Sequence, residues 1–475
     1  MSDFWIPRPD QQQVMEFILP RKRAAVWSPP GGGKTVMAAT WLEDGMCNTL
    51  DIKRVLIVAP KMVAETGWPV QLGLWSHLRH LAADARVITN QDLGRRTGPA
   101  RRLEFIDKRA TKKHLLGLRE RIHVCSWDQF PWLAKAYGTG WPYDALVLDE
   151  SSFVRDQGSD RGRAARHVVQ RTGVVEHLLE LTATPAVNHE EAAYAQLDLI
   201  EPGLLGRNLT DFREQFCLPA SRDWRTGQVF SWKVAPAMRG EYERRCASVA
   251  VSVPPSLGVP LVEAPVWVDL PDVTRAAYRD MERDLVWSGV IAGSAAVQHL
   301  KLRQMASGFV YDDTGQAIGL DTVKMQRLAE LVEEIDEPIL VAFAFDEELA
   351  RLRGLFPGQV ADIRERGARE RFEQGKLRVL AVHPASAGHG VDGLQRVCRH
   401  IVWTTVPEDR ELYDQTNGRV HRHGTQADTV FCHVLVSRNT VEGDIWREVL
   451  PGKLAMHDLL MRATRVRAAE PELAR

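Results

Sequence analysis

The sequence predicts an α/β protein with two lobes, each a mostly parallel sheet with helices on both faces, joined by a helical connector. Three observations support this fold class. Short apolar runs recur in two groups and are followed by helix-like stretches, as in parallel strands with crossover helices. A glycine-rich loop follows the first run. Between the two groups, residues of about 236–310 show helical stretches and proline-rich breaks instead.

The apolar runs give the expected strands and the boundaries of the lobes. The first group comprises residues 24–27, 54–59, 122–125, 145–149 and 178–182. The second group comprises residues 339–343, 378–382, 400–404 and 430–436. We therefore expect an N-terminal lobe over 1–235, a helical connector over 236–310 and a C-terminal lobe over 311–475.

Composition excludes several classes of protein. The 475 residues are 44% hydrophobic and 26% charged, which is typical of a globular protein and not of a fibrous or disordered one. The formal net charge of -1 gives no overall field that attracts nucleic acid or a membrane, so such attraction must come from local patches. No apolar run approaches the roughly 18 to 20 residues that cross a bilayer, so we expect a cytoplasmic protein without membrane contact. The six cysteines lie far apart without a C-x-x-C pair, which predicts free, mostly buried thiols.

The strongest local signal is the glycine-rich loop Ser28-Pro-Pro-Gly-Gly-Gly-Lys-Thr35 between an apolar run and a helix-compatible stretch. Glycines allow consecutive backbone N–H groups to curl around phosphates. The Lys34 ammonium neutralises β and γ oxygens, and the Thr35 hydroxyl is suited to bind Mg²⁺. The loop therefore predicts phosphate binding.

Two carboxylates, Asp149 and Glu150, end the apolar run at 145–149. They are expected at the carboxyl edge of a buried parallel strand, where open α/β sheets bind ligands. Asp149 is suited to hold Mg²⁺ through water, and Glu150 to orient and deprotonate the attacking water. Combined with the phosphate loop, the pair predicts nucleotide hydrolysis.

Two arginines near the C-terminus, Arg419 and Arg422, are three residues apart. On a helix this spacing places both guanidinium groups on one face, so that they can point at the same anion. The alternative is a solvated basic helix face. An ATPase site needs a donor for transition-state charge, and a second lobe that supplied it would make catalysis depend on lobe closure.

These blocks resemble the motifs of superfamily-two helicases and, within them, of the Swi/Snf-like ATPases. Residues 8–11 resemble the adenine-reading glutamine motif. Further motifs stand in the family's order at 58–61 (motif Ia), 149–152 (motif II), 181–185 (motif III), 386–394 (motif V) and 415–426 (motif VI). The Swi/Snf-like branch is indicated by the residues around the motifs, such as 199–206, which are followed by Phe212 and Phe216.

The resemblance implies two RecA-like lobes with ATP in the cleft, DNA held across both lobes, and ATP-driven tracking along duplex DNA. It implies ATP binding by Gln11, Gly31, Gly32, Gly33, Lys34 and Thr35, and metal binding by Thr35 and Asp149. It implies catalysis by Glu150, Gln415, Arg419 and Arg422. It implies coupling of hydrolysis to DNA grip through Thr182, Thr184, Gly390 and Asp392.

The sequence departs from the family pattern in motif II, which ends in Ser151-Ser152 where the family more often has Ala-His. Coupling to motif III would then run through hydroxyls rather than an imidazole. The short connector, with no accessory reader domain or nuclease motif, resembles the minimal versions of phages and other mobile elements. We therefore expect the protein to act in the cytoplasm of a bacterial or phage-infected cell.

A basic segment at 91–121 carries ten Lys or Arg residues against four acids. In a nearly neutral protein this local excess predicts phosphate contacts with DNA, which depend on salt and not on base sequence. The alternative is a solvated insertion loop, and at residues 95–102 the sequence favours neither. The expected DNA contacts are Lys61, Arg101, Arg102, Lys112 and Lys113.

Our leading hypothesis is an ATP-dependent DNA translocase that hydrolyses ATP to ADP and phosphate with Mg²⁺, stimulated by duplex DNA. A strand-separating helicase is one alternative, although it needs a wedge that the sequence does not reveal. An ATP-gated DNA clamp or adaptor that recruits a nuclease or recombination partner is the other.

Overall fold

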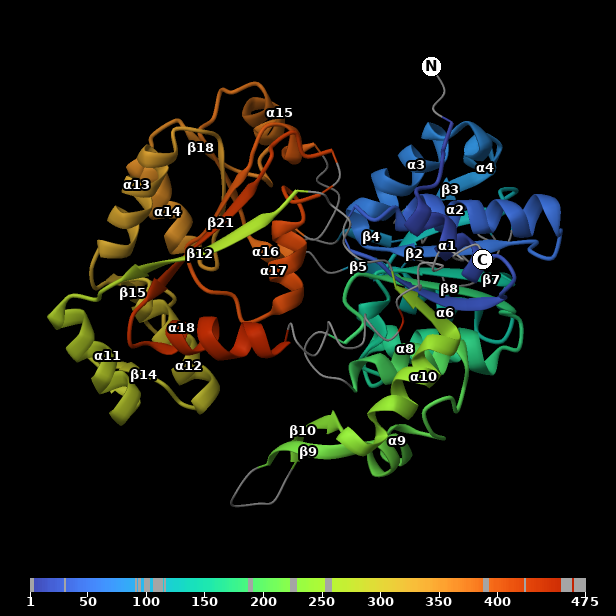
Figure 1. Ribbon diagram of the computed structural model, residues 1–475, viewed down its shortest axis with the longest axis horizontal. Helices are drawn as coiled ribbons and strands as arrows, with labels where there is room; N and C mark the ends of the chain where they lie inside the picture. The colour runs from blue at the N-terminus through green and yellow to red at the C-terminus, as the bar shows by residue number, and fades with distance from the viewer. Residues whose placement is uncertain are drawn as a thin grey trace, which may run out of the picture. The chain divides into compact units, whose positions relative to one another are not determined.

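The structure is a computed structural model that describes residues 4–29, 31–89, 92, 95–97, 103–105, 114, 117–186, 191–222, 229–252, 259–387, 393–422, 424–453 and 464. The chain divides into two compact units, residues 1–255 with 455–475, and residues 256–454 (Figure 1). Each unit is built on one parallel sheet with helices on both faces, which confirms the predicted fold class of two α/β lobes.

The first unit contains a seven-stranded parallel sheet in the order β11-β1-β8-β7-β2-β6-β3. Its strands are β1 (Arg23–Trp27), β2 (Val55–Ala59), β3 (Ala85–Val87), β6 (Ile122–Ser126), β7 (Ala145–Asp149), β8 (His177–Thr182) and β11 (Ala250–Ser252). Five of them coincide with the predicted runs to within one residue at either end. Since all the strands are parallel, their carboxyl ends meet at one edge of the sheet.

Helices cover both faces of the first sheet (Figure 1). On one face, the strand residues Val26, Ile57 and Leu181 belong to a hydrophobic core. This core is covered by α1 (Pro9–Ile18), α2 (Lys34–Glu43), α3 (Trp68–Leu74) and α4 (Arg79–Ala83). The opposite core is closed by α6 (Phe130–Tyr137), α7 (Asp160–Arg166), α8 (Ala192–Ile200), α9 (Leu209–Phe216) and α10 (Arg239–Val249). Because both faces of the sheet are buried, its strands are continuous apolar runs, and such runs can be recognised in the sequence.

The second unit contains a six-stranded parallel sheet in the order β12-β21-β20-β17-β19-β18. Its strands are β12 (Leu261–Val268), β17 (Ile339–Ala342), β18 (Val360–Asp362), β19 (Val379–Val382), β20 (His400–Trp403) and β21 (Val430–Ser437). One core is closed by α13 (Val323–Ile335) and α14 (Asp346–Leu355), and the other by α15 (Ala368–Glu373) and α17 (Arg410–Asn417). A satellite core joins α11 (Asp272–Asp284) to α12 (Ala295–Ala306).

Shorter elements complete the two units. Four antiparallel hairpins are described: β4 (Arg95–Thr97) with β5 (Leu103–Phe105), β9 (Cys217–Arg222) with β10 (Val229–Val234), β13 (Val286–Trp287) with β14 (Val290–Ile291), and β15 (Phe309–Tyr311) with β16 (Ala317–Gly319). The short helices α16 (Pro384–Ala387) and α18 (Val441–Asp444) belong to the second unit. Among the described residues, no helix combines the length and the hydropathy that a bilayer crossing requires.

The structure differs from the predicted division at 235 and 310, because each of the two sheets contains one strand from within 236–310. Strand β11 pairs with β1 in the first sheet, and β12 pairs with β21 in the second. Thr464 accepts a hydrogen bond from the Ser252 backbone N–H at 2.9 Å, so this residue also belongs to the first unit and not to a C-terminal lobe. Of the prolines that suggested breaks, Pro254 and Pro255 lie outside the described residues, and Pro271 precedes α11. Pro265 lies within β12, an edge strand, where a missing N–H costs little.

Candidate active site at the carboxyl edge of the first sheet

The glycine-rich loop connects the end of β1 to the start of α2. Gly31 and Gly33 have positive φ angles of 78° and 89°, a conformation that only glycine adopts readily. A Cβ atom on Gly32 would stand 1.9 Å from the Ser28 Oγ, and one on Gly33 would stand 2.2 Å from the Gln11 Nε2. The loop therefore leaves no room for side chains, as a cradle of backbone N–H groups for phosphate requires.

Helix α1 holds Gln11 against this loop. The Gln11 Nε2 donates to the Gly32 carbonyl at 3.0 Å, and its Oε1 accepts from the Arg8 backbone N–H at 3.1 Å. The Arg8 guanidinium donates to the same Gly32 carbonyl at 3.2 Å. The residues of the predicted glutamine motif thus contact the predicted phosphate loop directly.

Lys34 and Thr35 are the first two residues of α2. The Lys34 Nζ donates to the Ser28 carbonyl at 2.6 Å, so the ammonium group lies within the curl of the loop. Its positive charge lowers the pKa values of Asp149 and Glu150, against the larger effect of their burial. The loop, the lysine and both carboxylates therefore form one cluster.

Asp149 is the last residue of β7, and its carboxylate is buried. Burial raises the pKa of this carboxyl, while Lys34 and a hydrogen bond from the Trp68 indole oppose the shift. The Trp68 Nε1 donates to the Asp149 Oδ2 at 2.9 Å. The Trp127 Nε1 donates to the Asp149 backbone carbonyl at 2.8 Å. Two indoles thus hold the end of the strand in place.

Glu150 turns sharply out of β7, with a left-handed φ of 65° that costs energy for a residue with a side chain. Its Oε1 accepts hydrogen bonds from the Thr182 Oγ1 at 2.7 Å and the Ser152 Oγ at 3.2 Å. Burial raises the pKa of Glu150, and Lys34 opposes this rise. A carboxylate with a raised pKa is a better proton acceptor near neutral pH.

Two hydrogen-bonded paths lead from this cluster to motif III. In the first, Thr182 donates to Glu150 and accepts the Thr184 backbone N–H at 3.0 Å. In the second, the Ser151 Oγ donates to the Gln196 Oε1 at 2.8 Å, and the Gln196 Nε2 donates to the Pro185 carbonyl at 2.8 Å. Hydroxyls therefore link motif II to motif III, as its Ser-Ser ending suggested.

Sequence reasoning missed three residues that shape this site. Trp68 and Trp127 belong to none of the motifs, yet their indoles hold Asp149. Gln196 lies on α8 and carries no motif. Its only sequence signal is a polar side chain within an apolar helix, and it is completely buried in the structure.

Glu180 is a buried carboxyl on β8, in register with Ala25 of β1 and Leu148 of β7. The Ser151 hydroxyl lies near this carboxyl, and its hydrogen bond opposes only part of the effect of burial on the pKa of Glu180. Burial raises the pKa of Glu180 well above its ordinary value of 4.5. The folded chain therefore keeps this proton to a higher pH than the unfolded chain does.

Replacing Glu180 by glutamine is expected to flatten the pH dependence of stability. Because the folded state holds the extra proton, wild-type stability should fall as pH rises above about 4.5. Glu180→Gln removes this loss and should stabilise the chain by about 1 kcal/mol or more at about pH 8. Urea unfolding at several pH values measures it. Exposed Glu176, whose pKa is lowered mainly by its hydrogen bond from Lys22, is the control, because Glu176→Gln leaves this slope unchanged.

The predicted motif VI residues lie in the second unit. Gln415 is buried on α17, and its Nε2 donates to the Glu411 Oε1 at 3.2 Å. The prediction that Arg419 and Arg422 share a helix face is wrong, because α17 ends at Asn417. Both half-buried arginines lie in the following turn, which Thr425 closes by donating to the Arg422 carbonyl at 2.6 Å.

The predicted coupling and DNA-contact residues are only partly described. Gly390 and Asp392 of motif V, and the basic residues Arg101, Arg102, Lys112 and Lys113, lie outside the described residues. Lys61 is exposed just after β2, at the same edge of the sheet as the phosphate loop. Arg121, at the end of the basic segment, is paired with Asp84 at 2.5 Å.

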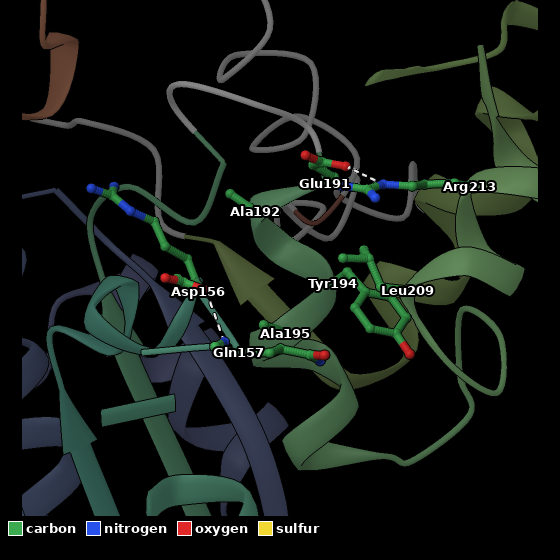
Figure 2. Close-up of a pocket in the computed structure, with 10 residues that line it drawn as sticks. Asp156, Gln157, Glu191, Ala192, Tyr194, Ala195, Leu209 and Arg213 are labelled. Carbon is green, nitrogen blue, oxygen red and sulfur yellow. Dashed lines mark hydrogen bonds and ion pairs between the residues drawn. The ribbon is translucent and has the colours of Figure 1, made fainter. Parts of the chain in front are cut away.

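A separate open pocket of about 350 Å³ lies between the segment after motif II and helices α8 and α9 (Figure 2). Its charged groups pair locally: the Arg213 Nε donates to the Glu191 Oε2 at 2.8 Å, and Asp156 accepts from the Gly158 N–H at 2.8 Å. Among the described residues that line it, none is a predicted ATP-binding residue. The candidate active site is therefore the phosphate-loop cluster.

Comparisons with known proteins identify chains that are similar to this one. No protein-family model matches the chain. "Putative protein p41" of Acyrthosiphon pisum secondary endosymbiont phage 1 is 28% identical over 487 residues, covering 96% of this chain and 98% of that protein. "Uncharacterized ATP-dependent helicase YqhH" of Bacillus subtilis (strain 168) is 21% identical over 339 residues, covering 64% and 57%. The solved Sulfolobus solfataricus SWI2/SNF2 ATPase core in complex with dsDNA aligns over 98% of this chain and 94% of its own, with 16% identity and a TM-score of 0.42.

Proposed function

We infer that the chain is a Swi/Snf-like member of the superfamily-two helicases, and from this premise we propose that it is an ATPase that translocates on duplex DNA. One observation carries the proposal: Lys34, Asp149 and Glu150 form a single cluster that Thr182 joins to motif III. The order of the motifs and the similarity to a helicase of Bacillus subtilis support it.

ATP would bind with its phosphates in the glycine-rich loop, where the Lys34 ammonium would exchange its bond to the Ser28 carbonyl for phosphate oxygens. The Thr35 hydroxyl and the Asp149 carboxylate are the groups that would hold Mg²⁺, and oxygen ligands of this kind suit that ion. When bound, Mg²⁺ neutralises charge on the β and γ phosphates. Trp68 holds the Asp149 carboxylate in place.

Glu150 would orient the attacking water and accept its proton. Thr182 and Ser152 hold one carboxylate oxygen, which leaves the Glu150 Oε2 to accept the bond from water. The raised pKa that burial gives Glu150 suits it to take up a proton near neutral pH. Proton transfer would then weaken the Thr182 bond, which gives motif III a signal that hydrolysis has occurred.

Arg419 and Arg422 would stabilise the charge of the transferring phosphoryl group, with Gln415 beside them. Guanidinium groups bind phosphate oxygens in pairs of parallel hydrogen bonds, which suits them to this role. Because they belong to the second unit, hydrolysis would require the two units to close on ATP. Duplex DNA bound by both units would favour closure, and repeated closure and opening would move the chain along DNA.

The test is steady-state ATP hydrolysis with no nucleic acid, duplex DNA, single-stranded DNA and RNA, combined with displacement of a third strand from a triplex. We expect stimulation by duplex DNA and ATP-dependent displacement. Arg422→Ala should lose both, whereas the control Arg279→Ala, an exposed residue of α11, should keep both. A rate that stays flat under all four conditions contradicts the motor. Retention on DNA without displacement indicates a clamp or adaptor, and unwinding of a forked duplex indicates a strand-separating helicase.

Removing the Ser151 hydroxyl is expected to uncouple ATP hydrolysis from DNA. Ser151→Ala breaks the bond to Gln196 that leads to Pro185, but leaves Glu150 and its partners in place. We expect basal hydrolysis to change by less than about twofold, while stimulation by duplex DNA falls by about threefold to tenfold, the rate equivalent of one buried hydrogen bond. Titration of the ATPase rate with DNA measures it, and Ser248→Ala on α10 is the control. Undiminished stimulation rules this path out.

A further inference from the structure

Three metal-ligating side chains meet at the far end of α2 from the phosphate loop. They are Glu43, the last residue of α2, Cys47 in the π-helical turn Asp44–Asn48 that follows, and His80 on α4. One ligand atom from each lies within 4.8 Å of the other two. The Cys47 Sγ is 3.3 Å from the His80 Nε2, which is 4.0 Å from the Glu43 Oε1.

These distances suit a tetrahedral ion. A zinc ion holds sulfur at about 2.3 Å and nitrogen at about 2.0 Å, which places two such ligands about 3.5 Å apart. The Cys47 to His80 distance already has this value to within a few tenths of an ångström. The Glu43 Oε1 needs to approach the His80 Nε2 by less than about 1 Å, a movement that rotation of the terminal χ angle of Glu43 supplies.

The backbone that carries the three ligands is held by the core. Leu42 and Met46, the neighbours of Glu43 and Cys47, are buried in the same core as Leu81, the neighbour of His80. Gly45 allows Ile52 to pack against the turn, because a Cβ at this position would stand 2.3 Å from the Ile52 Cδ1. The ligands are thus preorganised on packed elements, which lowers the entropy cost of binding an ion.

Cys47 differs from the other cysteines of the chain. All six are free thiols, but Cys47 is half-buried where the other five are buried. An ion from solvent therefore reaches this thiol. His77 lies one turn before His80, but its Nε2 hydrogen bonds to the Thr40 Oγ1 at 2.9 Å, which leaves the three-residue cluster as the ligand set.

We propose that Glu43, Cys47 and His80 bind one zinc ion, with water as the fourth ligand. Thiolate, imidazole and carboxylate together favour Zn²⁺, whereas Mg²⁺ takes oxygen ligands, so the two ions occupy different sites. Glu43 follows Lys34 by nine residues, which places the zinc site about 14 Å along α2 from the phosphate loop. The zinc ion ties the helix that begins at the phosphate loop to α4.

The test uses the full chain without a polyhistidine tag, stripped of metal by a chelator and titrated with Co²⁺ as a spectroscopic substitute for zinc. We expect one equivalent to bind, with visible d–d bands of a four-coordinate site and a near-ultraviolet thiolate-to-cobalt charge-transfer band. Added Zn²⁺ should bleach both. Zinc should also raise the melting temperature of the stripped chain, since it binds the folded state.

Variants decide whether the ion sits in this cluster. Cys47→Ser should abolish the charge-transfer band, and Cys47→Ser, His80→Ala and Glu43→Gln should each weaken zinc binding by about tenfold or more. The control His167→Ala, a histidine of the turn after α7, should bind as the wild type does. Melting of each variant in chelator shows that it is folded. The proposal is overturned if the stripped chain binds less than one equivalent of Co²⁺, if the spectrum lacks the thiolate band, or if Cys47→Ser retains that band.

Discussion

Replacing Glu150 by glutamine is expected to lower the rate of ATP hydrolysis by about 100-fold to 10,000-fold while ATP still binds. Glutamine keeps the shape of the side chain and accepts the Thr182 and Ser152 hydrogen bonds through its carbonyl, but it cannot take a proton from water. The measurement is a single-turnover hydrolysis assay beside a binding titration with a fluorescent ATP analogue.

The matched control for this prediction is Glu180→Gln, a second buried carboxyl on the neighbouring strand β8. Glu180 has no place in the proposed chemistry, so its variant should hydrolyse ATP within about twofold of the wild type. If Glu150→Gln keeps wild-type hydrolysis, Glu150 is not the general base. If both variants lose hydrolysis together, the loss reflects the fold of the sheet.

Replacing Lys34 by alanine is expected to lower ATP hydrolysis by about 100-fold to 1,000-fold and to weaken ATP binding as well. The change removes the positive charge that faces the phosphates and also stabilises the two carboxylates of motif II. Without it the pKa values of Asp149 and Glu150 should rise further, because the largest effect that opposes burial is lost. The pH profile of the remaining activity should therefore move to higher pH, since Glu150 must be ionised to act.

Steady-state hydrolysis and nucleotide titration from about pH 6 to pH 9 measure both effects. The control is Lys22→Ala, which removes an exposed lysine paired with Glu176 at 2.8 Å, just before β1. Lys22→Ala should leave hydrolysis and its pH profile unchanged. A Lys34→Ala variant that binds and hydrolyses ATP as the wild type does would contradict the phosphate-loop assignment.

The central strands were predictable because each is buried on both faces and therefore appears as an unbroken apolar run. The run at 145–149 matches β7 at both ends. Strands β11 and β12 were missed for the opposite reason. They lie at the ends of their sheets and next to prolines, so their sequences resemble breaks in a helical connector.

The residues proposed to carry out the chemistry could be predicted, because they stand at characteristic spacings within short motifs. The residues that hold them in place could not be predicted. Trp68 contacts Asp149 across 81 positions, and Gln196 contacts Ser151 across 45. Only the order of the strands brings these side chains together. Arg419 and Arg422 were predicted on a helix because residues three apart lie on one helix face. They lie instead in a turn closed by hydrogen bonds from the Thr425 hydroxyl, which the spacing of residues in the sequence does not reveal.

The position of β11 beside β1 has a consequence for synthesis and dissection of the protein. The strand that leads into the phosphate loop acquires its outer neighbour only after residue 252 has been made. A fragment cut at residue 235 would present the unpaired hydrogen-bonding groups of β1 to solvent, and such strands recruit other chains. The first unit in isolation therefore needs residues 236–252 to stay monomeric, and a nascent chain cannot complete this sheet until they leave the ribosome.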